Sequence, residues 1–402
     1  MLKSEVALNR PERFAAAQNL SNEKLETAAA AAIRKLERNL QKFGNNFIEG
    51  YTVDLKYQKV PDFPKAEDYW RYWGNGMYTG QYWLAYELTG NKRFYYAALA
   101  QIENFKKRVE NRLGLEDHDV GFLYIPSCVA GYKAAGIKEA RQIALSAADI
   151  LYERFSKKGG YIKRAGDDNS AAIGCHRTMV DTMMNIPLLL WAGKETGNGK
   201  YTEAAKVHCR TTMSYLIRED ASTFHQYQFD PQTQLPLKGI TSQGYSDDSC
   251  WSRGQAWMLY GLPIAYSYTK NDELIDVHKN LAYYFLNNLP SDGVPYWDLT
   301  FGDGSPEPRD SSAGVISICG FLEMMNHLPS DALQKKVFQN ASAQMMNAAI
   351  DNCCDDESDG LLLHTSAAVP QGFGIDECTV YGDYFYLEAL VRYLKPDWSM
   401  YW

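Results

Sequence analysis

An acidic side chain in apolar surroundings is the first candidate for chemistry in this sequence. Asp181 lies among Met179, Val180, Met183 and Met184, in what we expect to be an apolar helix. A carboxylate in such a position is costly unless it is paired or takes part in a reaction. Its removal from water would raise its pKa, which suits a general acid. The alternative is a structural aspartate that a backbone amide or an arginine satisfies.

A second group of candidates lies at residues 116–122, EDHDVGF, where His118 and Asp119 open an apolar run. These residues could be no more than a helix cap, with acidic side chains near the positive end of the helix dipole. Together with Asp181, Asp119 would instead provide two separated carboxylates. Acid–base chemistry on carbohydrates uses such a pair.

Residues 241–257, TSQGYSDDSCWSRGQAW, bring together Gln243, Arg253 and Trp257 with a second tryptophan. An arginine can bind a carboxylate through two parallel hydrogen bonds, and tryptophan rings stack on flat ligands. These residue types predict one wall of a polar, aromatic cleft. The alternative is a structural ion pair between Arg253 and Asp247 or Asp248.

The composition limits the class of protein. The 402 residues are 46% hydrophobic and 22% charged, which excludes wholesale disorder. A net charge of −8 argues against nucleic acid or an anionic membrane as partner. The longest apolar run, 186–192, is far shorter than the ~20 residues that cross a bilayer. The 28 tyrosines and 9 tryptophans favour a cleft that stacks hydroxylated ligands.

Eight cysteines without a C-x-x-C pair are typical of reduced, mostly buried thiols in a reducing compartment. The first residues lack the apolar segment of a signal peptide, so we expect a cytoplasmic location. A periplasmic location would require that such a segment had been removed. The seven histidines are scattered, and no phosphate-binding loop or H-E-x-x-H motif occurs. We therefore expect no metal and no organic cofactor.

Helical periodicity dominates the chain, with stops at Gly90, Gly136 and Gly197. Apolar segments are expected at 73–89, 118–135, 178–196, 250–269, 310–328 and 380–395. Amphipathic segments are expected at 24–43, 91–112, 138–156, 200–218, 271–289 and 331–350. Helices that are apolar all round belong inside, and helices with one polar face belong outside. The pattern predicts an all-α fold, a six-fold α/α toroid of six inner and six outer helices.

We expect one domain over residues 1–402, with about the first 20 residues as a peripheral arm. Short strands are expected at 224–229, 295–299 and 361–364, in the connections before inner helices. In such a toroid the beginnings of the inner helices and the loops before them share one mouth. The candidate residues above should meet there.

Four blocks of the chain resemble the unsaturated glucuronyl hydrolases of glycoside hydrolase family 88. They are HDVGF at 118–122, DTMMN at 181–185, WSRGQAW at 251–257 and YGDYF at 381–385. The resemblance extends from about residue 25 to residue 393 and implies a six-fold α/α barrel. It also implies a hydrolase that acts on lyase products with a 4,5-unsaturated uronic acid at the non-reducing end. The family hydrates the C4=C5 bond by protonating C4 and adding water at C5, and the hemiketal then rearranges and releases the sugar.

The resemblance also implies roles for individual residues. Asp181 matches the general acid/base, a role worth roughly 10²–10⁴ in rate. Asp119 matches a second carboxylate that contacts ring hydroxyls and keeps Asp181 protonated by repulsion. Trp73 and Trp257 would stack on the sugar, and Arg253 would face the uronate carboxylate or the water around it. Three further residues match positions of the family cleft: His118, His225 and Gln243.

The chain departs from the family pattern in three places. Ala165 stands where a tryptophan is common, which weakens stacking beyond the scissile sugar. Ser242 replaces a histidine and removes one polar contact. Ala368, Gln371 and Phe373 stand where members that accept sulfated glycosaminoglycan ends carry Ser-x-x-Ser-x-Lys. Without that lysine we expect a preference for unsulfated substrates.

Three alternatives remain open from the sequence. One is the related activity on unsaturated galacturonyl-rhamnose, and another is a sugar-binding toroid without catalysis, suggested by Ala165 and Ser242. A third is a sugar epimerase, which would need a pair of catalytic histidines that we cannot assign. The presence of both Asp119 and Asp181 favours the hydrolase. We expect an unsaturated uronate oligosaccharide as the only partner of a monomer or weak homo-oligomer.

Overall fold

Helices with a polar face alternate along the chain with helices that are apolar on all sides. The computed structural model describes residues 5–63, 72–165 and 173–402. These residues are mostly helical, which confirms the all-α class. The helices with a polar face are α1 (Asn22–Phe43), α3 (Lys92–Asn111), α6 (Lys138–Glu153), α8 (Gly199–Tyr215), α10 (Glu273–Asn287) and α12 (Leu333–Asn352).

The apolar helices alternate with these. They are α2 (Asn75–Thr89), α4 (Val120–Tyr124), α5 (Ala130–Ala135), α7 (Pro187–Thr196), α9 (Ser252–Thr269), α11 (Ser311–Met325) and α13 (Val380–Leu394). Nearly every residue of α11 and α13 is buried. Helices without a polar face are stable only where other elements surround them.

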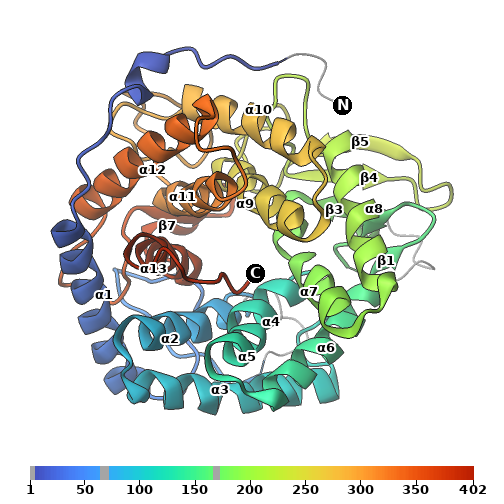
Figure 1. The fold of residues 1–402 in the computed structure, drawn as a ribbon. Helices are drawn as coiled ribbons and strands as arrows, with labels where there is room; N and C mark the ends of the chain where they lie inside the picture. The colour runs from blue at the N-terminus through green and yellow to red at the C-terminus, as the bar shows by residue number, and fades with distance from the viewer. Residues whose placement is uncertain (1–4, 64–71, 166–172) are drawn as a thin grey trace.

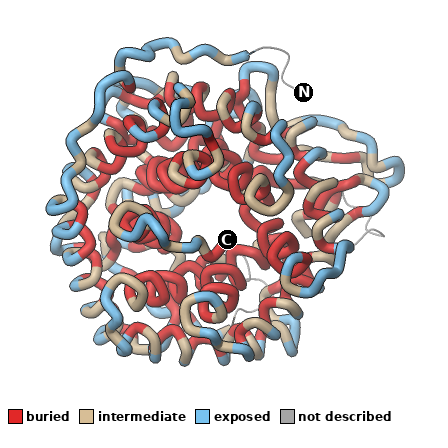
Figure 2. The backbone as a smooth tube through the Cα atoms, viewed as in Figure 1, coloured by how far each residue is buried: buried red, intermediate tan, exposed pale blue. Residues whose placement is uncertain are grey.

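The apolar helices form an inner layer that closes on itself. α2 packs against α13, α13 against α11, α11 against α9, α9 against α7, α7 against α4, and α4 against α2. Figure 1 shows the polar-faced helices arranged around this layer. Figure 2 shows that buried residues concentrate in it. The main hydrophobic core therefore lies between the two layers.

Glycine ends several helices as the sequence predicts. Gly90, Gly136 and Gly197 follow α2, α5 and α7 with φ of 69°, 68° and 69°. This left-handed conformation is unfavourable for residues with a Cβ atom. Each inner helix can thus stop at once and the next outer helix can begin.

Two predicted inner helices are interrupted. The prediction of one helix over 178–196 is wrong, because strand β3 (Arg177–Met179) and the 3-10 turn η5 (Val180–Met184) precede α7. Pro187 lacks an N–H and occupies the first turn of α7. Asp181 therefore lies in a short turn and not inside an apolar helix. In the predicted helix 118–135, the π-helical turn η3 (Ile125–Val129) contains Pro126 and separates α4 from α5.

The strands are short and lie in the connections before inner helices. β3, β4 (Gln226–Phe229) and β5 (Pro236–Ile240) form one antiparallel sheet, in which Met179 pairs with Gln226. β6 (Thr365–Ala368) and β7 (Phe373–Glu377) form a hairpin joined by η6 (Val369–Gln371). β1 (Phe155–Ser156) pairs with β2 (Tyr161–Ile162). The strand expected at 361–364 begins at Thr365 instead, and the stretch 295–299 makes only isolated bridges.

The first described residues run along the outside of the outer layer (Figure 1). The Val6 N–H donates to Asn280 Oδ1 at 2.6 Å, and Asn340 Nδ2 donates to the Phe14 carbonyl at 2.8 Å. Phe14 belongs to the short helix η1 (Pro11–Phe14) and is buried. The segment is thereby attached to α10 and α12. Within the ranges given above, no helix has the length and apolar character that crossing a membrane requires.

Candidate active site

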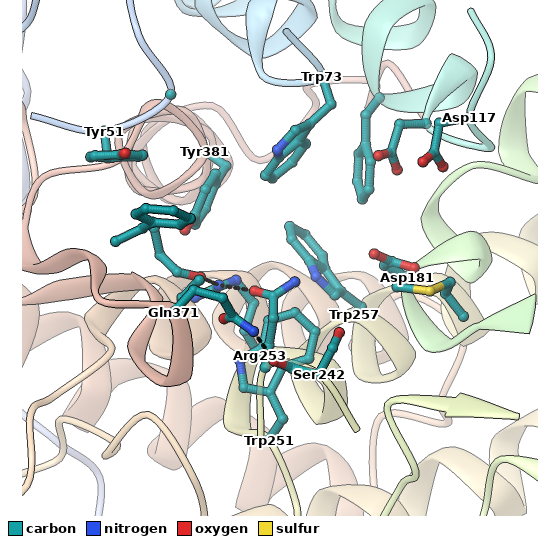
Figure 3. Close-up of a pocket in the computed structure, with 18 of the residues that line it drawn as sticks. Tyr51, Trp73, Asp117, Asp181, Ser242, Trp251, Arg253, Trp257, Gln371 and Tyr381 are labelled. Atoms are coloured by element: carbon teal, nitrogen blue, oxygen red, sulfur yellow. Dashed lines mark hydrogen bonds between the residues drawn. The ribbon is translucent and has the colours of Figure 1, made fainter. Parts of the chain in front are cut away.

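A cavity of about 390 Å³ opens where the inner helices begin. Figure 3 shows Trp73 and Trp257 on facing walls, with Asp117 and Asp181 at one end and Tyr51 and Gln371 at the other. Of the residues that the sequence predicts for the site, all but one line this cavity: Trp73, His118, Asp119, Asp181, Gln243, Arg253 and Trp257. The exception is His225, which lies behind one wall.

Three carboxylates surround one imidazole at the end of the cavity. His118 Nε2 lies 3.0 Å from Asp181 Oδ1 and 3.4 Å from Asp119 Oδ1. On the other side of the ring, His118 Nδ1 forms an ion pair with Asp117. Arg164 Nη2 lies 3.4 Å from the second oxygen of Asp117. Two elements that are distant in the sequence, the loop before α4 and the turn η5, thus form one charged cluster.

Close backbone packing brings these two elements together. A Cβ atom on Gly121 would lie 2.4 Å from Asn185 Cα, so only glycine allows α4 to approach η5 this closely. Asn185 then joins the two sides, because its Oδ1 accepts the Phe122 N–H at 2.9 Å and its Nδ2 donates to Asp119 Oδ1 at 3.4 Å. The same Nδ2 donates to the Asp181 carbonyl at 3.3 Å.

The cluster distributes charge unequally. Burial and the neighbouring Asp117 and Asp181 charges raise the pKa of Asp119 to about 7, although His118 opposes the shift. Burial alone would lower the pKa of His118, but the three carboxylates outweigh it and raise that pKa well above its usual value. Burial opposes ionisation of Asp117 too, yet His118 and Arg164 lower its pKa to about 2. These shifts favour an ionised Asp117, a charged His118 and an Asp119 carboxyl that gains or loses its proton near pH 7.

Aromatic rings enclose the space next to the cluster. Trp73 stacks on Tyr381 with ring centroids 4.9 Å apart and planes inclined by 22°. Phe122 packs against both Trp73 and Trp257, at centroid distances of 5.3 and 5.0 Å. Flat apolar faces of this kind suit the face of a sugar ring.

Arg253 lines the cavity, but protein groups already occupy its terminal nitrogens. Its guanidinium forms a buried ion pair with Asp310 and donates to the Ser366 carbonyl at 2.8 Å. Nη2 donates to Gln243 Oε1 at 3.2 Å. The partner is therefore neither Asp247 nor Asp248, the two that the sequence suggests. Arg253 thereby orients the amide of Gln243 as well as offering positive charge to the cavity.

His225 supports the polar wall from behind. Its Nδ1 accepts the Ser242 and Gln243 N–H groups at 3.1 and 3.2 Å, so in the neutral ring Nε2 carries the proton. Burial lowers the pKa of His225 to about 3, so the ring stays neutral at ordinary pH. Gln226 Nε2 donates to Ser242 Oγ at 2.6 Å. These bonds hold the loop that carries Gln243.

The rim of the cavity consists of segments that depart from the family pattern. Gln371 Nε2 donates to the Ser242 carbonyl at 2.6 Å and so links the β6–β7 hairpin to the loop before α9. Phe373 is 41% exposed and stacks on Tyr51, with centroids 6.4 Å apart and planes at 15°. Ala165 pairs with Asp117 across an isolated bridge. Two of the three departures are thus linked to each other by a hydrogen bond, and the third lies beside the charged cluster.

Sequence reasoning missed several residues of the site. Asp117 and Phe122 stand in the block around His118, but their neighbours in space are not evident from the sequence. Tyr381 was part of a recognised block without a role. Asp310 gives only a weak signal in the sequence, although it directly precedes α11 as other site residues precede their inner helices.

Asp117, His118 and Asp119 also have atoms of metal-ligand type within 4.8 Å of one another. His118 Nδ1 already faces Asp117, and His118 Nε2 faces Asp119 and Asp181. We therefore assign these atoms to hydrogen bonds and ion pairs within the cluster.

The sequence as a whole matches one family. The description Glycosyl Hydrolase Family 88 matches residues 43–394, which is most of the chain. The chain belongs to glycosyl hydrolase family 88. The family match and the relatives' names support glycoside hydrolase activity.

Relatives within glycosyl hydrolase family 88 cover nearly the whole chain. An unsaturated chondroitin disaccharide hydrolase of Streptococcus pneumoniae is 43% identical over 398 residues, 98% of each chain. An unsaturated glucuronyl hydrolase of Bacillus sp. is 34% identical over 380 residues, 94% of this chain and 98% of that one. A crystal structure of the Streptococcus agalactiae unsaturated glucuronyl hydrolase superposes with a TM-score of 0.94 at 38% identity, covering 99% of this chain and 98% of that one. A variant of the S. agalactiae enzyme, with a TM-score of 0.87 and 36% identity over 99% of this chain and 98% of its own, is complexed with dGlcA-GalNAc6S.

Proposed function

We propose that this enzyme removes the 4,5-unsaturated glucuronic acid from the non-reducing end of oligosaccharides that polysaccharide lyases produce. Relatives of nearly full coverage have this activity in their names, and one related structure contains an unsaturated disaccharide. The observation that carries the proposal is the pair of carboxylates, Asp119 and Asp181, on one imidazole nitrogen beside an aromatic enclosure. In this proposal the flattened half-chair ring of the unsaturated uronate stacks between Trp73 and Trp257, with its double bond toward the carboxylates.

In the proposed reaction, Asp181 donates its proton to C4 of the enol ether. A water molecule then attacks C5 and returns a proton to Asp181, which regenerates the acid. The C4–H and C5–O bonds form as the C4=C5 π bond is lost. The hemiketal at C5 opens by breaking the C5–O5 bond, which leaves a ketone at C5 and a hemiacetal at C1. Collapse of that hemiacetal breaks the C1–O bond, releases the shortened sugar with the proton on its oxygen, and leaves the uronate as a keto acid with an aldehyde at C1. General acid–base catalysis of this kind contributes roughly 10²–10⁴ in rate.

The other site residues bind and orient the sugar. Asp119, with its raised pKa of about 7, can donate a hydrogen bond from a neutral carboxyl to a ring hydroxyl. Trp73 and Trp257 stack on the ring. Gln243, oriented by Arg253, faces the uronate carboxylate or the attacking water. His118 and His225 organise the two walls around Asp181.

The enzyme prefers unsulfated substrates in this proposal. At the rim, Ala368, Gln371 and Phe373 line the cavity and carry no positive charge. The described cationic side chains of the cavity, Arg164 and Arg253, come from other segments and are held by Asp117 and Asp310. A sulfate on the second sugar would lose its hydration without gaining a cation from the hairpin.

The architecture in this proposal is a six-fold α/α toroid that forms a single domain over residues 1–402, with an N-terminal arm. The closed sequence of packed inner helices supports it. All eight cysteines are free, which supports a cytoplasmic location. The protein acts as a monomer or weak homo-oligomer, with the oligosaccharide as its partner and without nucleic acid.

The test is the ultraviolet absorbance of the conjugated C4=C5 bond in lyase-generated disaccharides. Unsulfated and sulfated products of hyaluronan, chondroitin and heparin are compared at equal concentration. We expect absorbance to fall fastest for an unsulfated disaccharide, and Asp181→Asn to lower kcat by at least about 10²-fold while the sugar still binds. Near-wild-type turnover in Asp181→Asn would refute the acid/base role. Turnover of unsaturated galacturonyl-rhamnose alone would refute the glucuronyl assignment.

A further inference from the structure

Asp117 has no part in the proposed reaction, yet it makes the closest contacts to the central imidazole. Its Oδ1 forms the ion pair with His118 Nδ1 and also accepts the His118 backbone N–H at 2.6 Å. The same carboxylate therefore holds both the ring and the backbone of His118. These two contacts, one to the ring and one to the backbone, restrict the rotamer of the His118 side chain.

Both nitrogens of the imidazole face carboxylate oxygens. Nδ1 faces Asp117, and Nε2 faces Asp181 and Asp119 at 3.0 and 3.4 Å. Asp117 forms an ion pair with Nδ1, and the Asp181 oxygen nearest Nε2 can accept a hydrogen bond, so this geometry is compatible with a proton on each nitrogen. The ring is 98% removed from solvent, since its exposed fraction is 2%. The protein thus surrounds a buried cation with its own counter-charges.

Arg164 holds the far side of Asp117. Its Nη2 lies 3.4 Å from Asp117 Oδ2, while Asp117 also pairs with Ala165 through a backbone bridge. The guanidinium charge keeps Asp117 ionised, and the bridge fixes the carboxylate's position. Arg164, Asp117 and His118 then form a row of alternating charge that ends 3.0 Å from Asp181, the reacting group.

Apart from burial, the largest effects on the charge of His118 come from the three carboxylates. His208 on α8 and His225 beside β4 are both buried, and burial lowers the pKa of each to about 3. Both are therefore neutral near pH 7. The ionisable groups that act on the imidazole are the three carboxylates and, through Asp117, Arg164.

We propose that Asp117, held by Arg164, is a positioning residue that keeps His118 doubly protonated and aims its Nε2–H at Asp181. After Asp181 gives its proton to C4, the imidazolium stabilises the carboxylate that remains. It thereby stabilises the negative charge that develops on Asp181 in the first step and holds the Asp181 oxygens in place for the second. This inference rests on the proposed role of Asp181.

The direct test is the protonation of His118 in Asp117→Asn without substrate. Asparagine keeps the size and an acceptor oxygen but removes the charge. His118 is observed by NMR of ¹³Cε1-labelled histidine and assigned with His118→Gln. We expect an imidazolium at pH 7 in the wild type, and a titration at least about one pH unit lower in Asp117→Asn. An unchanged titration, or a neutral His118 in the wild type, would overturn the proposal. This measurement needs no turnover, so its failure is distinct from failure of the proposed function.

Kinetics provide a second readout that a purely structural role would not produce. We expect kcat of Asp117→Asn to fall about tenfold or more with KM changed by less than about threefold. Arg164→Gln should act in the same direction more weakly, and Arg164→Lys should restore most of the rate because the charge returns. A rise in KM with kcat unchanged would show that Asp117 binds the sugar instead, and would contradict the proposal.

Discussion

At the scale of the residue, Asp119 should set the pH above which the enzyme loses activity. Its pKa is raised to about 7, first by burial and then by the charges of Asp117 and Asp181. Below that pH the neutral carboxyl donates a hydrogen bond, whereas above it a new negative charge faces Asp181. We expect kcat/KM on an unsaturated disaccharide to fall about tenfold per unit above about pH 7. Asp119→Asn cannot ionise, so its residual activity should lack this limb. A wild-type rate that is constant from pH 6 to 9 would contradict the assignment.

At the scale of the element, the contact between α4 and η5 decides whether the two carboxylates meet. Gly121→Ala would place a Cβ atom 2.4 Å from Asn185 Cα. Because Cα is a backbone atom that cannot rotate away as a side chain could, α4 has to move. We expect a loss of about 1–3 kcal/mol in the free energy of unfolding and a kcat reduced by about tenfold or more. Gly302→Ala is the matched control, since no atom lies within 4 Å of its added Cβ, and it should change stability by less than about 0.5 kcal/mol. Thermal unfolding and disaccharide kinetics check both variants, and equal behaviour of the two would refute the argument.

At the scale of the whole molecule, the C-terminal tail enters the centre of the inner layer and supports the site from behind (Figure 1). Trp402 is buried, donates from Nε1 to Glu388 Oε2 at 2.9 Å, and packs edge-on against Phe122 at 6.2 Å. We expect Trp402→Ala to cost about 3–5 kcal/mol and to raise KM, because Phe122 loses its support against Trp73 and Trp257. Trp398→Ala, on the same tail but packed on Tyr401, should leave KM within about twofold. Denaturant unfolding measures the loss of stability and initial rates measure KM. An unchanged KM in Trp402→Ala would contradict a role of the C-terminal tail in supporting the site.

The sequence by itself determined the kind of fold and most of the residues in the cavity. Alternating polar-faced and apolar helices follow from side-chain burial, and Gly90, Gly136 and Gly197 mark helix ends because of their backbone freedom. Asp181 is evident as a carboxylate in an apolar segment, and Asp119 is evident beside His118 at the opening of an apolar run. Local chemistry of this kind can be inferred from the sequence alone.

Only the tertiary structure decided which charges pair. Asp117 is one of three acidic residues among positions 116–119. Its hydrogen bond to the His118 N–H depends on a backbone turn that no residue pattern specifies. Arg253 pairs with Asp310 and not with Asp247 or Asp248, which are nearer in the sequence. The packing of α9 against α11 brings the Asp310 carboxylate to the guanidinium. Asp181 lies in the turn η5, because α7 begins only at Pro187. Pairing energies depend on distance and burial across the fold, and those are properties that the order of residues along the chain does not contain.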